Sequence, residues 1–360
     1  MQIFSADKIF TGNEWLENKA VVIESNRIKE IIPAAENAKH FPNAFIAPTF
    51  IDLQIYGAGK KLFAVYPEKD ALVKLVDYCR SGGAAFCMPT VATNHYDAFY
   101  KCIDAVKSYW QDGGTGILGL HIEGPWISKA KRGAHVEACI HSPTVEQAKK
   151  LLEYGKGVIK IITLAPEVCS KEIIDLAHSY NVVISAGHSN ATYEEATSAF
   201  DNGIKTATHL YNAMSALQHR SPGMVGAVLN HDKVMCSIIP DGHHVDYAAI
   251  RIAKKIMNER LFVITDAVTE TTEGYYPHQF AGDKYESNGI LSGSALTMAK
   301  AVKNLVQHCN IELSEALRMC SYYPAKLMGM ENEHGIIKPG AAASLVVMGE
   351  NFEVVEIIGQ

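Results

Sequence analysis

Four ionisable residues in the central part of the chain each lie at the end of a short apolar run. In chain order they are Glu123, His188, His209 and Asp266. One carboxylate and two imidazoles form a donor set that suits Zn²⁺ or Fe²⁺, and such a set leaves a coordination position open for water. A single histidine at the end of a strand is more often a hydrogen-bonded core residue. Three donor residues that each end an apolar run instead favour a metal site. We therefore expect one divalent metal ion held by Glu123, His188 and His209.

Asp266 has the residue type and the position of a general base. A divalent metal lowers the pKa of its bound water from about 15.7 towards 7, which makes hydroxide available at neutral pH. A carboxylate must then take a proton from the water and pass it to the leaving group. The alternative interpretation of Asp266 is an N-cap for the segment that follows it. Because neighbouring strand ends carry the metal donors, hydrolytic catalysis is the favoured interpretation.

Three loops that follow predicted strands carry further candidate site residues. His135 follows the third strand and could polarise a carbonyl group beside the metal. Asn212, Ala213 and Arg220 follow the sixth strand, and the pair His243-His244 follows the seventh. Arg220 and one of these histidines would supply a local positive charge for an anionic substrate, which the net charge of −6 does not supply. Ordinary surface-loop chemistry is the alternative for each loop.

The apolar runs that carry these residues belong to a series of eight, most of them followed by a stretch of helical periodicity. The runs span residues 50–54, 85–90, 117–123, 158–164, 182–188, 205–209, 234–240 and 261–266. Helices are predicted over 69–80, 96–110, 145–154, 171–180, 193–202, 246–258, 294–307 and 314–328. Eight strand–helix repeats are typical of a TIM-type (β/α)8 barrel, whose active site lies at the carboxyl ends of the strands. A doubly wound open sheet is the competing α/β fold, but the first strand–helix turn lacks Gly-x-Gly-x-x-Gly.

The two ends of the chain have a different pattern. Residues 1–47 and 335–360 consist of short alternating apolar runs separated by turn signals, which predicts antiparallel strands. Neither end can bury a core alone, so we expect the two to pair in one small β-domain. The catalytic barrel is then expected at residues 48–334.

Composition narrows the class of protein. The chain has 360 residues, of which 48% are hydrophobic and 20% charged, as in a globular enzyme with a large core. The net charge of −6 provides no positive field for nucleic acid. Neither an apolar run long enough for a membrane span nor an export signal is found, and the eight cysteines include no Cys-x-x-Cys pair. These features predict a cytoplasmic protein without membrane or nucleic-acid partners.

Five motifs, in order along the chain, resemble those of the N-acetylglucosamine-6-phosphate deacetylase family of amidohydrolases. They are HIEGPW at 121–126, SAGHSNAT at 185–192, THLYNAM at 208–214, DGHHVD at 241–246 and LSGSALTM at 291–298. The resemblance implies an amidohydrolase barrel with a small β-sandwich built from both chain ends. It also implies deacetylation of N-acetyl-D-glucosamine 6-phosphate to D-glucosamine 6-phosphate and acetate.

The resemblance further implies roles for individual residues. Glu123, His188 and His209 would hold one divalent metal, Asp266 would act as base and then acid, and His135 would stabilise the oxyanion. Substrate contacts are implied for Ala134, His135, Asn212, Ala213, Arg220, His244, Leu291, Ser292 and Gly293. A homodimer is also implied, with some phosphate contacts made by the neighbouring subunit.

The first strand departs from the pattern of related enzymes. Many amidohydrolases have His-x-His there and bind two metals, whereas this chain has Gln54 and Tyr56. The mononuclear enterobacterial type has Gln-x-Asn, so a single metal is expected here, although Tyr56 still differs. Thr49 also replaces the usual glycine after Pro48. The role of Tyr56 is left open at this point.

Two alternative functions remain at the level of the sequence. The first is deacetylation of a related sugar phosphate such as N-acetylgalactosamine 6-phosphate, which differs in the orientation of one hydroxyl. The second is a barrel that has lost catalysis and serves as a scaffold. The scaffold is disfavoured because the three metal donors and Asp266 are all present.

Overall fold

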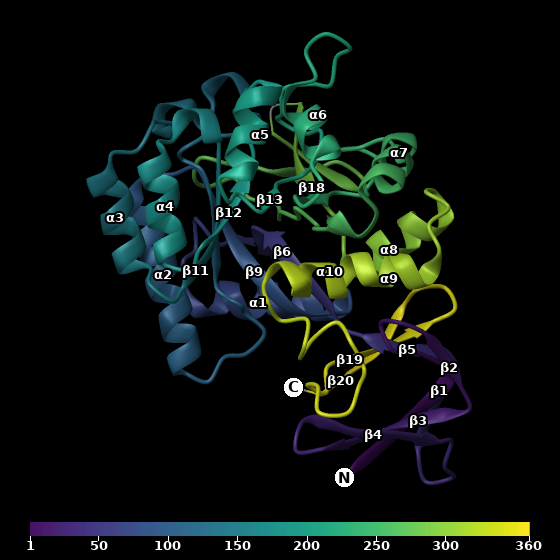
Figure 1. The fold of residues 1–360 in the computed structure, drawn as a ribbon. Coiled ribbons are helices and arrows are strands. Elements are labelled where there is room, and N and C mark those ends of the chain that lie inside the picture. The colour runs from purple at the N-terminus through teal and green to yellow at the C-terminus, as the bar shows by residue number, and fades with distance from the viewer. Residues whose placement is uncertain (288, 360) are drawn as a thin grey trace.

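The computed structural model describes residues 1–287 and 289–359, so residues 288 and 360, within the two predicted domains, lie outside the described residues. Eight strands form the centre of the molecule (Figure 1). They pair in chain order and all neighbours are parallel. The strands are β6 (Phe50–Ile55), β9 (Ala84–Ala92), β10 (Leu120–Glu123), β11 (Ile159–Leu164), β12 (Val183–Ala186), β13 (Thr206–Ala207), β14 (Met235–Ile238) and β15 (Leu261–Val263). They are buried on nearly every residue, as in a sheet covered on both faces.

The first strand and the segment after the last strand close this sheet into a barrel. The backbone N–H of Asp266 donates to the carbonyl oxygen of Gln54 at 3.0 Å. The buried carboxylate of Asp52 accepts hydrogen bonds from both the backbone N–H and the hydroxyl of Thr265. The predicted (β/α)8 barrel is therefore confirmed, and these contacts also place Asp266 beside the first strand.

Helices cover the outside of the barrel (Figure 1). They are α1 (Lys69–Ser81), α2 (Tyr96–Gln111), α3 (Val145–Tyr154), α4 (Lys171–Ser179), α5 (Tyr193–Asp201), α6 (Gly223–Asn230), α7 (Tyr247–Met257), α8 (Met298–Gln307), α9 (Leu313–Cys320) and α10 (Tyr322–Leu327). Single 3₁₀ turns occur at Lys129–Lys131, Glu137–Cys139, Pro166–Val168 and Asn258–Arg260. Thr144 and Thr192 begin α3 and α5 with capping boxes, in which the threonine hydroxyl accepts a backbone N–H of the first turn. Among the described residues, no helix is long and apolar enough to cross a bilayer.

The helices after the eighth strand differ from the prediction. The single helix predicted over 314–328 is two helices, because the backbone at Ser321 leaves helical geometry (φ −126°, ψ −68°) and Pro324 lacks an N–H group. The helix predicted over 294–307 begins only at Met298, because Ser294 ends strand β18. Helix α6 was not predicted, since it is apolar and buried around its whole circumference and shows no amphipathic periodicity.

Strands from both chain ends form a separate seven-stranded sheet. Its members are β1 (Gln2–Phe10), β2 (Trp15–Glu17), β3 (Lys19–Glu24), β4 (Arg27–Pro33), β5 (Lys39–Pro48), β19 (Leu345–Gly349) and β20 (Val354–Ile358). The order is β20-β19-β5-β1-β3-β4, with β2 paired to β1. A second apolar cluster, which includes Phe4, Ile46 and Leu345, packs within this part of the molecule. The expected pairing of the two ends is confirmed, and the boundaries at residues 47 and 335 stay a prediction.

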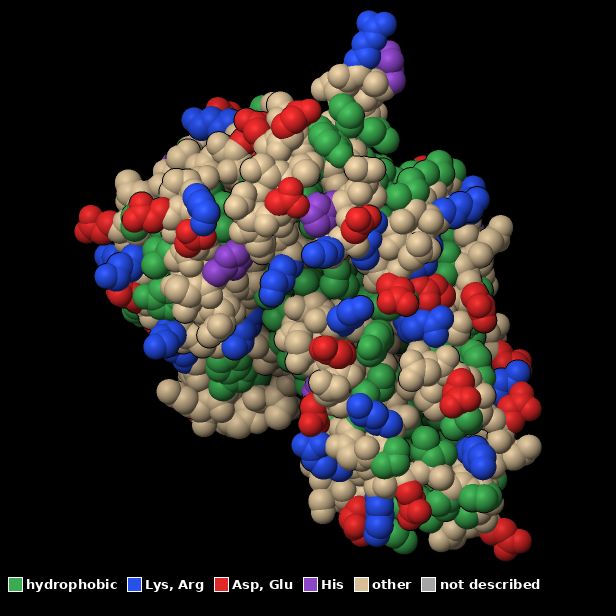
Figure 2. Space-filling view, in the orientation of Figure 1, with side chains coloured by type: hydrophobic (Ala, Val, Ile, Leu, Met, Phe, Trp, Pro, Cys, Tyr) green, Lys and Arg blue, Asp and Glu red, His purple; other side chains and the backbone are tan. Residues whose placement is uncertain are grey.

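Loops beyond the carboxyl ends of the strands cover the barrel mouth. Strands β7 (Gly57–Ala58) and β8 (Lys61–Leu62) form a hairpin after β6, and β16 (Gln279–Phe280), β17 (Lys284–Ser287) and β18 (Ile290–Ser294) form a small antiparallel sheet after β15. Residues 211–222, between β13 and α6, include a hairpin that projects from the molecule (Figure 1). Figure 2 shows cationic and histidine side chains at the tip of this projection. We call residues 216–221 the projecting hairpin.

Candidate active site

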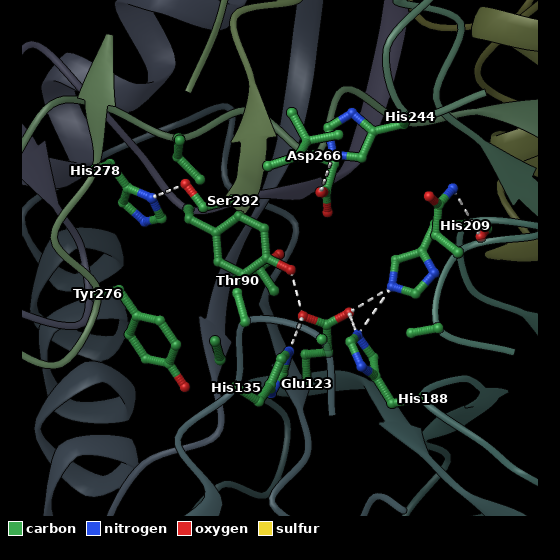
Figure 3. Close-up of a pocket in the computed structure, with 18 of the residues that line it drawn as sticks. Thr90, Glu123, His135, His188, His209, His244, Asp266, Tyr276, His278 and Ser292 are labelled. Atoms are coloured by element: carbon green, nitrogen blue, oxygen red, sulfur yellow. Dashed lines mark hydrogen bonds and ion pairs between the residues drawn. The ribbon is translucent and has the colours of Figure 1, made fainter. Parts of the chain in front are cut away.

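One cavity of about 240 Å³ lies at the carboxyl ends of the barrel strands (Figure 3). All four strand-end residues, Glu123, His188, His209 and Asp266, line it. Seven of the nine predicted substrate residues line it as well, namely Ala134, His135, Asn212, Ala213, His244, Leu291 and Ser292. Strands and loops far apart in the sequence therefore converge on one site, as the strand-end pattern predicts.

The three predicted metal donors face one another at short range. Oε1 of Glu123 lies 3.4 Å from Nε2 of His188 and 3.2 Å from Nε2 of His209, and the two nitrogens are 3.1 Å apart. Nδ1 of His188 donates to the carbonyl oxygen of Lys131 at 2.9 Å, so its Nε2 carries a lone pair. A tetrahedral ion with bonds of about 2.0–2.1 Å requires donors about 3.3–3.4 Å apart. The donor set therefore fits one divalent cation.

A third imidazole approaches the same carboxylate from its other oxygen. Nε2 of His135 lies 3.2 Å from Oε2 of Glu123, and Glu123, His135 and His188 together also have the spacing of a metal-binding group. Burial lowers the pKa of His135 to about 4, so the ring is neutral at physiological pH. Since the carboxylate accepts, the proton lies on Nε2. This nitrogen is a hydrogen-bond donor directed into the cavity.

Thr93 and Gly124 hold His135 in place. Oγ1 of Thr93 lies 2.6 Å from Nδ1 of His135. A Cβ atom added to Gly124, which has a φ of +79°, would lie only 2.1 Å from that same hydroxyl. Any side chain at position 124 would displace the threonine, so the glycine of the HIEGPW motif is required for close approach.

Three of the four strand-end residues have an unusual backbone. His188, His209 and Asp266 have φ values of 48°, 40° and 54°, in the left-handed region that non-glycine residues avoid. Each such residue costs about 1–3 kcal/mol, and such strain concentrates at functional sites. The left-handed turn redirects the chain directly at the strand end, where the side chain enters the cavity.

Asp266 lies beside the donor cluster without joining it. Nε2 of Gln54 donates to Oδ1 of Asp266 at 2.8 Å and to Oε1 of Glu123 at 3.0 Å. Burial raises the pKa of Asp266, and the negative charge of Glu123 raises it further. A carboxylate whose pKa is raised toward neutrality is suited to take up and return a proton.

His244 faces Asp266 from the other side. Its Nε2 lies 3.9 Å from Oδ2 of Asp266, while its Nδ1 donates to Oδ2 of Asp241 at 2.6 Å. Oδ1 of Asp241 accepts the backbone N–H groups of His243 and His244 at 2.9 and 2.8 Å. Burial alone would raise the pKa of Asp241, but the His244 ring and these N–H groups lower it below its usual value. Asp241 is therefore a carboxylate held in place by two backbone N–H groups, and it orients the ring of His244.

Two predicted substrate residues do not line the cavity. Arg220 is exposed in the projecting hairpin, where Gln218 and Ser221 exchange backbone hydrogen bonds of 3.1 and 3.2 Å. Gly293, in β18, is packed against the lining residue Val268, since a Cβ atom on Gly293 would be 2.5 Å from Cγ1 of Val268. The substrate contacts expected of Arg220 and Gly293 therefore stay predictions.

Several site residues were missed at the level of the sequence. Tyr276 and His278 line the cavity from the segment before β16. The hydroxyl of Tyr276 donates to the carbonyl oxygen of Thr93 at 2.6 Å, and Nδ1 of His278 lies 2.9 Å from Oγ of Ser292. Burial lowers the pKa of His278 to about 4, so it is a neutral hydrogen-bonding group. No periodicity marks this segment, whereas the DGHHVD motif could have indicated Asp241.

Comparison with known proteins agrees with this geometry. Residues 45–358 match the Amidohydrolase family, and residues 5–44 match the NagA composite domain. The chain is 32% identical to N-acetylglucosamine-6-phosphate deacetylase of Haemophilus influenzae, over 96% of this chain and 95% of that protein. It is also 32% identical to N-acetylgalactosamine-6-phosphate deacetylase of a Shewanella species, over 99% and 94%.

Solved structures show the same likeness. The crystal structure of N-acetylglucosamine-6-phosphate deacetylase from Pasteurella multocida matches with a TM-score of 0.94 and 34% identity, over 99% of this chain and 98% of that one. A Mycobacterium smegmatis deacetylase mutant in complex with N-acetyl-D-glucosamine-6-phosphate matches with a TM-score of 0.92 and 27% identity, over 99% and 97%. The chain therefore belongs to the amidohydrolase family, and within it to the deacetylases of N-acetylated amino-sugar phosphates.

Proposed function

We propose that this chain hydrolyses N-acetyl-D-glucosamine 6-phosphate to D-glucosamine 6-phosphate and acetate with one divalent metal ion per subunit. The observation that carries the proposal is the convergence of Glu123, His188 and His209, at donor spacings of 3.1–3.4 Å, next to Asp266 in one cavity. The names of the most similar relatives support the sugar and its phosphate. Zn²⁺ is the favoured ion because it accepts mixed nitrogen and oxygen donors in a tetrahedron, and Fe²⁺ accepts the same donors.

The residues of this chain divide the chemistry among them. Once bound, the cation would supply Lewis-acid charge that acidifies water and polarises the acetamide carbonyl. Asp266 takes a proton from the attacking water and returns it to the departing sugar nitrogen. The Nε2–H group of His135 donates toward the developing oxyanion. His244, held by Asp241, and Asn212 contact the sugar from the opposite wall.

We assign Arg220 to the phosphate group of a substrate bound in the neighbouring subunit. It is exposed on the projecting hairpin and does not line the cavity of its own chain. A guanidinium group is suited to bidentate phosphate binding. A homodimer in which each hairpin reaches the partner's cavity would use this residue. It would add an arginine to a cavity whose lining, among the described residues of one chain, includes none.

Two further assignments belong to the same proposal. Residues 1–47 and 335–360 form the terminal β-domain and residues 48–334 the catalytic barrel, since every proposed site residue falls within the barrel segment. The cytoplasm is the proposed compartment, supported by eight cysteines that are all free thiols.

The test is acetate release combined with metal analysis. Protein purified without chelators should hold about one divalent metal ion per chain, as three protein donors with an open position imply. It should release acetate from N-acetylglucosamine 6-phosphate much faster than from unphosphorylated N-acetylglucosamine. Metal-loaded protein that releases no acetate from either sugar would contradict the proposal.

N-acetylgalactosamine 6-phosphate is the second candidate substrate. The Shewanella relative named for that substrate is as similar to this chain as the Haemophilus relative named for the glucosamine compound, at 32% identity each. A side-by-side assay with both sugar phosphates decides between them. A higher kcat/KM for the galactosamine compound would replace the proposed substrate and leave the metal chemistry unchanged.

A further inference from the structure

A buried histidine in the cavity wall has one ring nitrogen that the folded chain leaves unpaired. His278 is 4% exposed and lines the cavity. Its Nδ1 lies 2.9 Å from Oγ of Ser292, whereas its Nε2 has no hydrogen-bond or ion-pair partner within residues 1–287 and 289–359. Because buried side-chain nitrogens nearly always have a partner, an unpaired one at a cavity wall indicates contact with a ligand.

The backbone and a neighbouring ring fix the position of His278. The N–H groups of Thr271 and His278 donate to each other's carbonyl oxygens at 3.1 and 3.0 Å, which closes the loop between them. The ring of Tyr276 lies nearly parallel to the imidazole, at an interplanar angle of 12° with the centroids 6.5 Å apart. Since Ser292 also holds Nδ1, the imidazole presents Nε2 in one orientation, as a preorganised binding group requires.

The chemistry of the ring indicates a hydroxyl group as the partner of Nε2. Burial lowers the pKa of His278 to about 4, and no charged group among the residues that the structure describes contributes to this shift. The ring is therefore neutral at physiological pH, with one N–H group and one lone pair. A hydroxyl can donate to or accept from such a ring, so it fits either tautomer. A phosphate is bound more strongly by a cationic side chain.

His278 lies on a different wall from the sugar contacts proposed above. Figure 3 shows His278 and Ser292 on the side of the cavity away from His209 and His244. Under the proposed function, the acetamide of the substrate lies at the metal cluster and its phosphate at Arg220. The ring hydroxyls at C1, C3 and C4 are the groups of the sugar that can both donate and accept. They are therefore the candidates for contact with this wall.

We propose that Nε2 of His278 binds one ring hydroxyl of the amino-sugar phosphate and thereby helps to determine which sugar the site accepts. Ser292 positions the imidazole by holding Nδ1. The contact acts on selection of the sugar and takes no part in the proton transfers at the acetamide. This inference rests on the proposed function, because the hydroxyl belongs to the substrate proposed there.

Deoxy substrates combined with a substitution test the contact. The substrates are N-acetylglucosamine 6-phosphate and its analogues that lack the hydroxyl at C1, C3 or C4. For the wild type, removal of the contacted hydroxyl should lower kcat/KM by about 10–100-fold, because a buried nitrogen loses its partner. The amide of His278→Asn lies near the position of Nδ1, so it can keep the bond to Ser292, but it has no atom at the position of Nε2. In His278→Asn, removal of the same hydroxyl should have little further effect.

Two other variants keep the test independent of the folding of His278→Asn. The amide of His278→Gln reaches the position of Nε2, so this variant should retain part of the sensitivity to the contacted hydroxyl. Tyr276→Phe is the matched control and should retain all of it, because the Tyr276 hydroxyl borders the same cavity but donates to a backbone carbonyl. Circular dichroism verifies that each variant folds. Coupling between His278 and the C4 hydroxyl would make this residue a determinant of glucosamine against galactosamine.

The outcomes separate this inference from the proposed function. Acetate release with the same sensitivity to each hydroxyl in the wild type and in His278→Asn would overturn the contact and leave the proposed function intact. A lower rate in His278→Asn with unchanged sensitivity would show only a structural role and would overturn the contact as well. A wild-type protein that releases no acetate from any of these substrates would contradict both.

Discussion

The cluster of Glu123, His188 and His209, which forms the floor of the cavity, and the projecting hairpin are built in opposite ways. In the floor, Glu123, His188 and His209 are at most 6% exposed, and their donor atoms lie 3.1–3.4 Å apart. In the hairpin, residues 216–221 are exposed, and Arg220 does not line the cavity. The two regions are joined by only a few residues after His209.

The difference indicates which part of the function one chain can complete. Rigid parallel strands deliver the reacting groups to the barrel mouth, so the chemistry of the floor is preorganised within a single subunit. The proposed phosphate contact of Arg220 instead depends on a loop that reaches outward, as contact with a second copy of the chain would require. The following predictions test this contrast.

The largest effect is expected from Asp266→Asn. The amide cannot take up the proton, so kcat should fall by about 10²–10⁴-fold. Zinc content should be unchanged, because Asp266 borders the donor cluster without completing it. Steady-state acetate release and metal analysis of the same sample check both. Near-normal turnover would remove Asp266 from the mechanism.

The next effect concerns the stability of the barrel at Asp52, where the first strand meets the segment after the last strand. Burial raises the pKa of Asp52 to about 7. Between about pH 4 and 7 the folded state therefore keeps a proton that the unfolded chain has lost, so the free energy of unfolding falls as the pH rises. Asp52→Asn removes this titration and can still accept the N–H of Thr265. Relative to the wild type, the variant should gain about 2–3 kcal/mol from pH 5 to 8, measured by denaturant unfolding.

An exposed carboxylate provides the control for this measurement. Asp104 lies on the surface and accepts from the Tyr154 hydroxyl. Asp104→Asn should differ from the wild type by a small amount at every pH. A pH-independent difference for Asp52→Asn as well would show that the Asp52 carboxylate is already ionised at pH 5.

A smaller effect is expected from Arg220→Ala. Loss of the guanidinium should raise KM for the phosphorylated sugar by about 10–100-fold, the cost of one charge-assisted contact. KM for the unphosphorylated sugar should change little. His219→Ala, in the same hairpin, is the matched control. Equal effects on both sugars would contradict the assignment of Arg220 to phosphate.

The smallest effect is the sharpest test of the contrast between the regions. If Arg220 acts across a dimer, mixing Asp266→Asn and Arg220→Ala subunits creates heterodimers with one intact site. With random exchange, about a quarter of all sites would be intact, since half the dimers are mixed and each has one such site. Refolding the mixture should therefore restore activity at low substrate concentration. Activity equal to the mean of the separate variants would place Arg220 within its own subunit's site.

Local patterns in the sequence were sufficient to predict the barrel and the residues at the ends of its strands. Glu123, His188, His209 and Asp266 could be found because an apolar run that ends in an ionisable residue is visible within a few positions of the chain. The prediction of one helix over residues 314–328, which used the same kind of local pattern, was wrong. The backbone at Ser321 divides this amphipathic segment into two helices.

Other features depend on contacts between distant parts of the chain. The hydrogen bonds from Tyr56 to Glu123 and from Thr265 to Asp52 join residues 67 and 213 positions apart, and they exist only because the barrel closes. The left-handed backbone at His188 is likewise imposed by the surrounding packing, since the residue is not a glycine. The sequence alone determined which side chains can do chemistry. The tertiary structure decided which oxygen of Glu123 faces the metal donors and which residues stand outside the cavity, because those choices depend on the closure of a ring of strands.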